Sequence, residues 1–180
     1  MPSKRLKRAV KIIRKYQMRS IVIILTTILL LTGVIGCVVP EGSQVGDKAP
    51  DFTLSTLDGG QITLSELKGK PVILVFWTTG CSACIHQMPF LETAQNEVGA
   101  DVEFINIDIG ESSSQVQAAV DYYEFSLTVA LDNDYSVSDA YNVIYTPTNI
   151  IIDRNGIITY VRKGSFLNTN EILERLGELE

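Results

Sequence analysis

An unbroken apolar run, V-I-L-V-F-W, occupies residues 72–77. A run of this kind, rich in β-branched and aromatic residues, predicts a strand buried on both faces. A Thr-Thr-Gly turn follows, and Cys81 and Cys84 then open a segment with helical character. This helix is predicted to extend to about Val98 and to stop at Gly99. The pattern therefore predicts a buried strand that leads into a helix with two cysteines at its start.

The rest of the body alternates between strand-like and helix-like segments. Before the central strand, an extended segment at 49–54 is followed by a hairpin turn at 58–60 and a returning strand at 61–64. The later segments are predicted strands at 102–108, 127–131, 148–153 and 157–161 and predicted helices at 111–125, 134–141 and from 168 to the end. This alternation predicts an α/β fold, in which helices cover both faces of a central sheet.

The beginning of the chain has a different pattern. Residues 21–39 carry no charged side chain, and their length suits a membrane span of about 20 residues. Residues 1–19 hold eight of the fifteen Lys and Arg, and the first acid is Glu41. The positive-inside rule then predicts a basic cytoplasmic leader at 1–20 and a transmembrane segment at 21–39, with the body on the extracytoplasmic side of the cell membrane. A linker at 40–48 and a folded domain at 49–180 complete the predicted organisation.

The apolar segment has two interpretations. It is either an uncleaved signal anchor or a lipoprotein signal, because residues 34–37, V-I-G-C, resemble a bacterial lipobox. In the second case Cys37 would be lipidated and would become the first residue of the mature protein. Both interpretations leave the domain tethered to the membrane in a compartment where disulfides persist.

The charge of the body restricts the class of partner. From Glu41 onward there are seven basic against twenty-one acidic residues, a net charge of −14. Nucleic-acid binding requires clustered Lys and Arg, so this composition argues against nucleic acid as a partner.

The two cysteines indicate redox chemistry. Positions three apart on a helix share a face and lie within disulfide reach. The unpaired N–H groups of a first helical turn favour the thiolate form of Cys81. The alternatives are a structural disulfide or half of a metal site, but a four-ligand site needs two further ligands and the body offers only His86 besides the pair. Neither a metal nor a cofactor is expected.

Several short motifs accompany the C-x-x-C pair. They are A-P-D-F at 49–52, F-W at 76–77, M-P-F-L at 88–91, Y-N-V at 141–143, T-P-T at 146–148 and I-I-D-R-N-G at 151–156. In this order they resemble the membrane-tethered TlpA/ResA-like thiol–disulfide oxidoreductases, within the redoxin and peroxiredoxin-related group. The resemblance covers residues 46–180. It implies a thioredoxin-like fold, with a central mixed sheet flanked by helices and an added N-terminal β-hairpin.

The resemblance also implies roles for individual residues. Cys81 would be the exposed nucleophile, and Cys84 the resolving cysteine. Pro147 would be a cis-proline facing the disulfide, and Thr146 would offer backbone atoms to a substrate strand. Trp77, which ends the predicted buried strand, is expected from that position to pack and to form a wall of the site.

The chain departs from the family pattern at three positions. Gly80 replaces the Trp that often precedes the first cysteine, and Val75 replaces the buried acid of thioredoxins. Gln87 replaces the Glu that several ResA-like members carry three residues after the second cysteine. Because neither usual position holds a carboxylate, proton transfer to the buried thiol is predicted to use water, Gln87 or the backbone.

The implied substrates are proteins with disulfides or thiols, with the haem-attachment cysteines of apocytochromes c as one candidate. The implied electron donor is a membrane-embedded thiol protein. One alternative is a peroxiredoxin-like thiol peroxidase that uses Cys81, because Thr78 stands three residues before it and Arg154 is a candidate distant arginine. The other is a non-enzymatic copper-handling module built on Cys81, Cys84 and His86.

Overall fold

The computed structural model of the chain describes residues 17–18 and 39–179. The chain divides into residues 1–38 and 39–180, and the second part holds the folded domain. The predicted span at 21–39, except Val39, and the predicted lipidation site Cys37 lie outside the described residues. Within the described part of the chain, no helix is long and apolar enough to cross a membrane.

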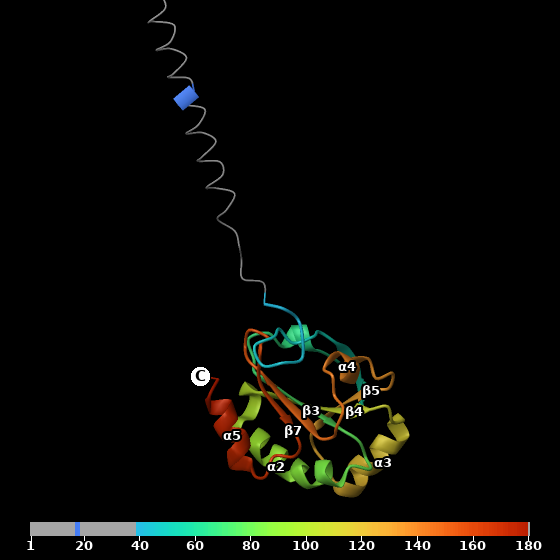
Figure 1. The fold of residues 1–180 in the computed structure, drawn as a ribbon. Coiled ribbons are helices and arrows are strands. Elements are labelled where there is room, and N and C mark those ends of the chain that lie inside the picture. The colour runs from blue at the N-terminus through green and yellow to red at the C-terminus, as the bar shows by residue number, and fades with distance from the viewer. Residues whose placement is uncertain (1–16, 19–38, 180) are drawn as a thin grey trace, which may run out of the picture. The chain divides into compact units, whose positions relative to one another are not determined.

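The domain alternates strands and helices, as the sequence predicted (Figure 1). The strands are β1 (Thr53–Thr56), β2 (Gln61–Thr63), β3 (Val72–Trp77), β4 (Glu103–Ile109), β5 (Thr128–Asp132), β6 (Thr148–Ile152) and β7 (Ile158–Lys163). The α-helices are α2 (Ser82–Val98), α3 (Ser113–Tyr123), α4 (Ser136–Ala140) and α5 (Thr169–Gly177), with short 3-10 helices η1 (Leu64–Leu67) and η2 (Gly99–Asp101).

The strands form one mixed sheet in the order β2-β1-β5-β4-β3-β6-β7. Strand β3 pairs in parallel with β4, which pairs in parallel with β5. The pairs β3–β6, β6–β7, β1–β5 and β1–β2 are antiparallel. The predicted N-terminal hairpin is therefore present as β1 and β2, and it extends the sheet beyond β5.

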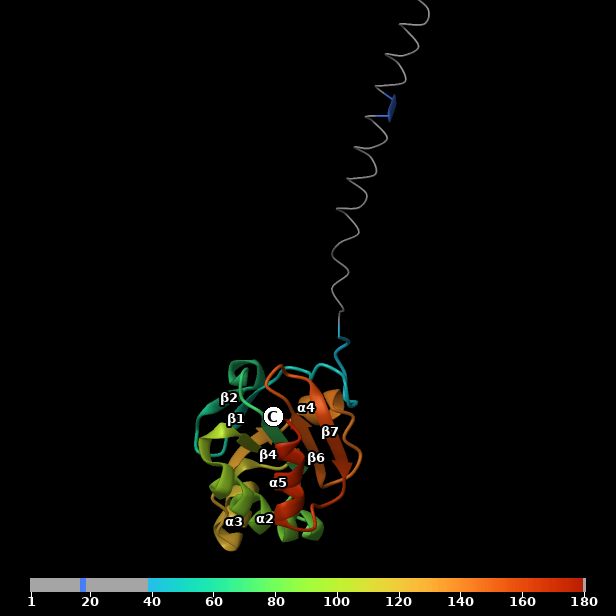
Figure 2. The same cartoon turned by 90° about the vertical axis from the view of Figure 1, so that its left-hand side faces the viewer.

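Helices cover both faces of this sheet (Figures 1 and 2). Buried side chains of α2, α3 and α5 pack on the face that carries Ile73, Val75 and Trp77. Helix α4, η1 and the segment before β1 pack on the face that carries Leu74 and Phe76. All six residues of β3 are buried, which confirms the prediction drawn from the unbroken apolar run.

The ends of the helices follow local hydrogen bonding. Cys81 occupies the N-cap of α2, and Gly99 ends this helix with a φ of 59°. Asn168 caps α5 by accepting a hydrogen bond from the backbone N–H of Glu171 at 3.0 Å. Helix α3 is shorter than the predicted 111–125, because Glu124 adopts a left-handed conformation and ends it.

The predicted linker at 40–48 is tied to the domain. The backbone N–H of Gly46 donates to the carbonyl of Ile158 at 2.8 Å, and the N–H of Ile158 donates to the carbonyl of Asp47 at 2.9 Å. Lys48 also forms an isolated bridge with Ile157, at the start of the last hairpin strand. The expectation of a flexible spacer missed these bonds, because they join residues far apart in the sequence.

Candidate active site

The two cysteines of the C-x-x-C motif form a disulfide. Their Cα atoms lie 5.2 Å apart, and the two sulfurs are bonded to each other. Cys84 is fully buried inside the first turn of α2, whereas Cys81 is partly exposed at the N-cap. The Cys81 sulfur accepts a hydrogen bond from the backbone N–H of Cys84 at 3.2 Å. One sulfur can therefore be reached from solvent, while the other is covered by the core.

The flank of Cys81 is open. Gly80, Ser82 and Ala83 are exposed, and a Cβ at Gly80 would meet no heavy atom within 4 Å. The absence of a tryptophan side chain at this position therefore leaves one side of the disulfide uncovered. Trp77 is instead fully buried in the core that contains Cys84, where its ring packs edge-on against Phe125 at 6.1 Å.

The loop before β6 lies at the same end of the sheet as the cysteines. The Thr146–Pro147 peptide bond is cis, as the resemblance implied. Thr148 pairs with Phe76, which places Pro147 level with the end of β3. The carbonyl of Pro147 accepts from the backbone N–H of Gly164 at 2.8 Å. The backbone groups of Thr146 form no hydrogen bond with another backbone group of the described residues.

Gln87 connects the cysteine helix to this loop. Its amide is fully buried and exchanges two hydrogen bonds with the Asn149 side chain, at 3.2 and 3.3 Å. Its oxygen also accepts from the backbone N–H of Phe166 at 3.0 Å. Asn149 in turn donates to the carbonyl of Gly164 at 2.8 Å. The side chain named in the sequence analysis as a proton route is thus engaged in bonds that join α2, β6 and the segment after β7.

Two carboxyl groups that are not among the predicted site residues lie beside the cysteine turn. Asp108, in β4, is the strand partner of Trp77 and is fully buried. The Glu111 carboxylate accepts from the backbone N–H of Thr79 at 2.6 Å and from its hydroxyl at 2.7 Å. The sequence signal that could have found them is an acid at the last residue of the predicted strand 102–108, followed by a second acid three residues later.

The pKa values of the two acids move in opposite directions. Burial, a hydrogen bond with Glu111 and the negative charge of Glu111 raise the pKa of Asp108 to about 8. Partial burial raises the pKa of Glu111, but hydrogen bonds from Asp108 and from Thr79 outweigh this effect and lower it overall. At neutral pH the pair therefore holds one proton, and it resides on Asp108.

The alternative functions find less support in the geometry. Arg154 lies in the turn between β6 and β7, where its carbonyl accepts from Gly69 just before β3 begins. Cys81 follows the other end of β3, so this arginine does not reach the thiol that a peroxidase would use. His86 is exposed on α2. Within the described residues, no three His, Cys, Asp or Glu side chains are grouped closely enough to hold a metal ion.

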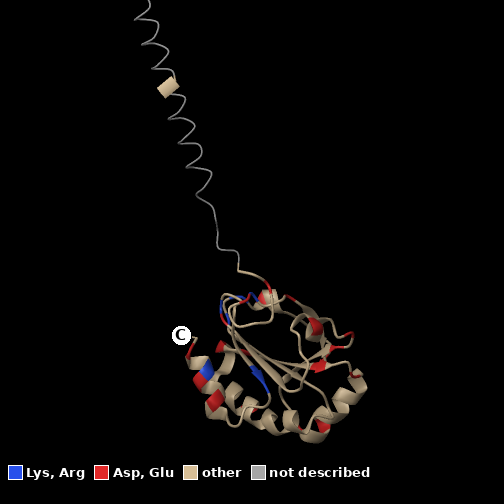
Figure 3. Cartoon of the chain, in the orientation of Figure 1, with Lys and Arg blue, Asp and Glu red and all other residues tan. Residues whose placement is uncertain are grey.

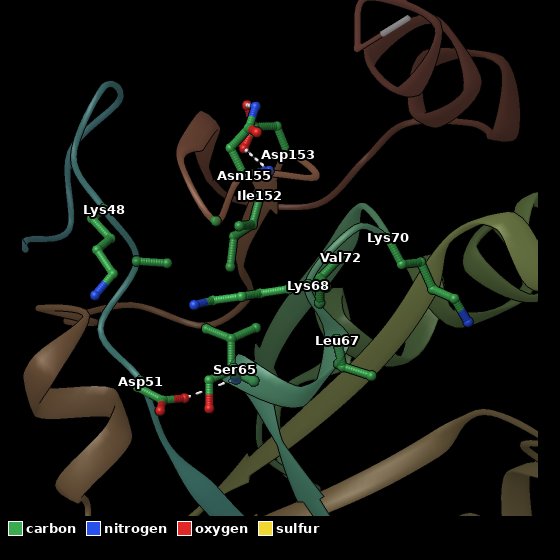
Figure 4. Close-up of a pocket in the computed structure, with 13 residues that line it drawn as sticks. Lys48, Asp51, Ser65, Leu67, Lys68, Lys70, Val72, Ile152, Asp153 and Asn155 are labelled. Carbon is green, nitrogen blue, oxygen red and sulfur yellow. Dashed lines mark hydrogen bonds between the residues drawn. The ribbon is translucent and has the colours of Figure 1, made fainter. Parts of the chain in front are cut away.

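A cavity of about 180 Å³ lies at the end of β3 opposite the cysteines (Figure 4). Val72, Lys48 and Lys68 are among the residues that line it, and Asp51 accepts there from the backbone N–H of Ser65 at 2.9 Å. None of the residues that line this cavity belongs to the predicted exchange site. Acidic residues occur on several helices and loops of the domain (Figure 3).

Comparison with known proteins assigns the family. The Redoxin family profile matches residues 44–176. The chain belongs to the redoxin family. This redoxin is 35% identical over 142 residues to the thioredoxin-like protein YneN of Bacillus subtilis, a match that covers 77% of this chain and 82% of that protein. It is 36% identical over 138 residues to the thiol-disulfide oxidoreductase ResA of Halalkalibacterium halodurans, which covers 76% and 77% of the two chains.

Solved structures resemble the redoxin in fold. The exposed lipoprotein thioredoxin Etrx1 of Streptococcus pneumoniae aligns with a TM-score of 0.66 and 29% identity, covering 72% of this chain and all of that one. A secreted disulfide oxidoreductase of Mycobacterium tuberculosis, homologous to DsbE of Escherichia coli, aligns with a TM-score of 0.64 and 26% identity, covering 71% and 96%. The redoxin is thus a TlpA/ResA-like thiol–disulfide oxidoreductase with a thioredoxin-like fold.

Proposed function

We propose that this redoxin exchanges protein disulfides through Cys81 and Cys84 while tethered to the outer face of the cell membrane. The observation that carries the exchange site is the unequal exposure of the two bonded cysteines at the N-terminus of α2. A reachable sulfur suits attack on a substrate, and a covered sulfur suits the release step.

In the reducing direction, the Cys81 thiolate attacks one sulfur of a substrate disulfide and the other substrate sulfur leaves as a thiolate. The Cys84 thiolate then attacks the Cys81 sulfur, which closes the ring and releases the second substrate sulfur. Two electrons pass to the substrate, whose thiolates take up the two protons given up by the cysteines. The same steps in reverse oxidise a substrate dithiol.

The backbone around the site supports both steps. Cys81 lies where the unpaired N–H groups of α2 favour a negative sulfur, and the N–H of Cys84 already donates to it. The backbone of Thr146, beside Pro147, bonds to no other backbone group of the described residues and is available to an extended substrate segment. The substrate class is accordingly a polypeptide that presents a cysteine in an extended strand.

The extracytoplasmic location is supported by the sequence of the leader and by the relatives. The basic residues before the uncharged segment 21–39 favour a cytoplasmic N-terminus. One structural relative is an exposed lipoprotein and another is secreted. Mass spectrometry of the mature N-terminus distinguishes the two forms of tether: a lipid-modified Cys37 indicates a lipoprotein, and an intact Met1 indicates a signal anchor.

The proposed partners are a membrane-embedded thiol donor and substrates such as apocytochrome c. The ResA-like relatives support a protein thiol or disulfide as substrate. Deletion of the gene, followed by haem staining of membrane proteins, tests the cytochrome role. Loss of covalently bound haem that returns with the wild-type chain, but not with Cys81→Ser, is expected; unchanged haem staining would remove apocytochrome c from the proposal.

Insulin reduction by dithiothreitol tests the activity itself. The full chain is expected to accelerate precipitation of the insulin B chain, and Cys81→Ser is expected to lose this acceleration. Ser82→Ala, which changes an exposed neighbour without removing a sulfur, serves as the matched control. Full activity of Cys81→Ser would refute the role of this cysteine, and rapid peroxide consumption by the wild type would favour the peroxidase instead.

A further inference from the structure

The carboxyl pair Asp108 and Glu111 lies at the end of the sheet where the cysteine turn begins. Asp108 is the strand partner of Trp77 on the face that packs against α2. The backbone N–H of Glu111 donates to one oxygen of Asp108 at 3.2 Å. The two side chains therefore occupy the edge from which the segment 78–81 leaves β3.

Glu111 fixes that segment directly. Its two oxygens accept separately from the N–H and the hydroxyl of Thr79, at 2.6 and 2.7 Å. The turn itself is closed by a hydrogen bond from the N–H of Cys81 to the carbonyl of Thr78 at 3.1 Å. A carboxylate thus holds the middle of the turn whose last residue is the nucleophile. Gln115 supports the carboxylate from α3 with a hydrogen bond at 2.7 Å.

When Asp108 is ionised, one of its two carboxylate oxygens lacks a hydrogen-bond donor. Its second oxygen is buried and accepts no hydrogen bond. An ionised carboxylate with an unpaired buried oxygen is costly, whereas a protonated carboxyl becomes a donor. Glu111, whose backbone N–H already donates to the first oxygen of Asp108, is the neighbouring acid, and its carboxylate can act as the acceptor for a protonated Asp108.

The surrounding charges favour the same protonated form. Glu111 and Asp132, the latter fully buried in β5, are the charged groups that act on Asp108, and both are acidic. The ion pairs found among the described residues, Lys70–Glu103, Arg162–Glu171 and Arg175–Glu178, include neither Asp108 nor Glu111. A second negative charge beside Glu111 would therefore be opposed by repulsion and by burial alike.

We propose that Asp108 is a positioning residue of the exchange site: its protonated carboxyl donates to Glu111 and thereby holds the Thr79 turn that presents Cys81. When Asp108 loses its proton, repulsion weakens the hold of Glu111 on Thr79 and the turn becomes mobile. The site would therefore be held by a carboxyl group from β4. The two positions at which family members carry an acid, Val75 and Gln87, are uncharged in this chain. This inference rests on the proposed exchange role of Cys81.

The first test follows the proton in the oxidised full chain, where the disulfide prevents both cysteines of the pair from titrating. Trp77 is the single tryptophan of the chain and the strand partner of Asp108, so its fluorescence reports on that carboxyl. The wild type is expected to show a step with a midpoint near pH 8. Asp108→Asn, which keeps a donor for Glu111, is expected to lose the step, and the exposed control Asp121→Asn is expected to keep it.

A further variant separates a coupled pair from an isolated buried acid. Glu111→Gln removes the negative charge beside Asp108, so the midpoint of the Trp77 step is expected to move to lower pH. An unchanged midpoint in Glu111→Gln would overturn the pairing. A step that persists in Asp108→Asn would assign the titration to another group and would also overturn the proposal.

The second test measures exchange. The reduction rate of the Cys81–Cys84 disulfide is followed from about pH 6 to about pH 9 at a constant concentration of dithiothreitol thiolate. In the acidic part of the range, the wild type and Asp108→Asn are expected to have equal reduction rates. Above the midpoint of the fluorescence step, the rate of the wild type is expected to be several-fold lower than that of Asp108→Asn. Parallel profiles throughout would refute the positioning role. Failure of the insulin assay would refute the proposed function but leave the fluorescence result unaffected, so the two failures can be distinguished.

Discussion

Cys81 and Cys84 are three positions apart, yet their surroundings differ in almost every respect. The first lies at a helix N-cap beside exposed Gly80, and the second is enclosed by the core that contains Trp77. Gln87 then shows how a single buried side chain can support such a site through its hydrogen bonds. Its hydrogen bonds to Asn149 and Phe166 hold the cysteine helix against the cis-proline strand.

Replacement of Gln87 by Ala is expected to destabilise the protein, because the Asn149 side chain and the N–H of Phe166 would remain buried without this partner. An unsatisfied buried group costs about 1–3 kcal/mol, so the free energy of unfolding in urea should fall by at least that amount. Gln117→Ala, which removes an exposed glutamine of α3, is the control and should change the value by less than about 0.5 kcal/mol. Equal effects of the two substitutions would contradict the role of Gln87.

The stability of the oxidised protein is expected to fall as the pH rises from about 4 to about 8, because of Asp108. Its folded-state pKa lies above the unfolded value, so the folded state binds more protons in this range and the slope of stability against pH is negative. The contribution of Asp108 to the free energy of unfolding is largest below pH 4 and is lost as the pH passes 8. Between these values the free energy of unfolding falls by at most about 1.4 kcal/mol per pH unit. The pKa of Glu111 is lowered in the folded state, so Glu111 stabilises the protein above its unfolded pKa and this stabilisation is lost only at acidic pH.

Asp108→Asn checks this assignment by urea denaturation at several pH values. The free energy of unfolding of Asp108→Asn should increase steadily relative to that of the wild type between about pH 4 and about pH 8. The difference between Asp121→Asn and the wild type should stay constant over this range. A constant difference between Asp108→Asn and the wild type across this range would show that Asp108 does not change its protonation on unfolding.

At the scale of elements, the parts of the fold that could be predicted from the sequence are those with a strong local signal. The apolar run of β3 and the stop of α2 at Gly99 are such signals, and both elements match the prediction. The approach of Glu111 to Thr79 has none, because it depends on β4 being the parallel neighbour of β3. The cysteines could thus be predicted as a site, whereas the carboxyl pair beside them became evident only from the packing of strands.

Helix α5, which packs against α2, offers a test of the cap that Asn168 forms in the structure. Asn168→Ala removes the oxygen that accepts from the N–H of Glu171, and the free energy of unfolding should fall by about 1 kcal/mol. Asn170→Ala makes the same change two residues later at an exposed position inside the helix and should have little effect. The cap assignment would be wrong if Asn170→Ala proved the more damaging of the two in urea denaturation.

At the scale of the whole domain, the cysteines and the point where the chain enters the fold lie at opposite ends of β3. Residues 40–48 are bonded to the last hairpin near the start of this strand, and Cys81 follows its end. If the chain is tethered as proposed, the ordered domain begins within about two residues of the predicted span. The exchange site therefore lies at the end of the domain opposite the segment 40–48.

Hydrogen exchange of the full chain tests whether the segment 40–48 belongs to the fold. The amides of Gly46 and Lys48 donate to carbonyls and should exchange more slowly than a free chain would. The amide of Val45, which donates to no backbone carbonyl of the described residues, should exchange fast. Fast exchange at all three amides would show that this segment is a flexible linker after all.

Trapping of a mixed disulfide tests the central claim most directly. In a Cys37→Ser background, Cys84→Ser leaves Cys81 as the single thiol of the chain. Mixed with a disulfide-bonded polypeptide, this variant should accumulate a covalent complex that dithiothreitol releases, because Cys84 is no longer present to resolve it. Cys81→Ser in the same background should trap little, since the Cys84 sulfur is buried. Equal trapping by the two variants, or more by Cys81→Ser, would contradict the assignment of Cys81 as the nucleophile.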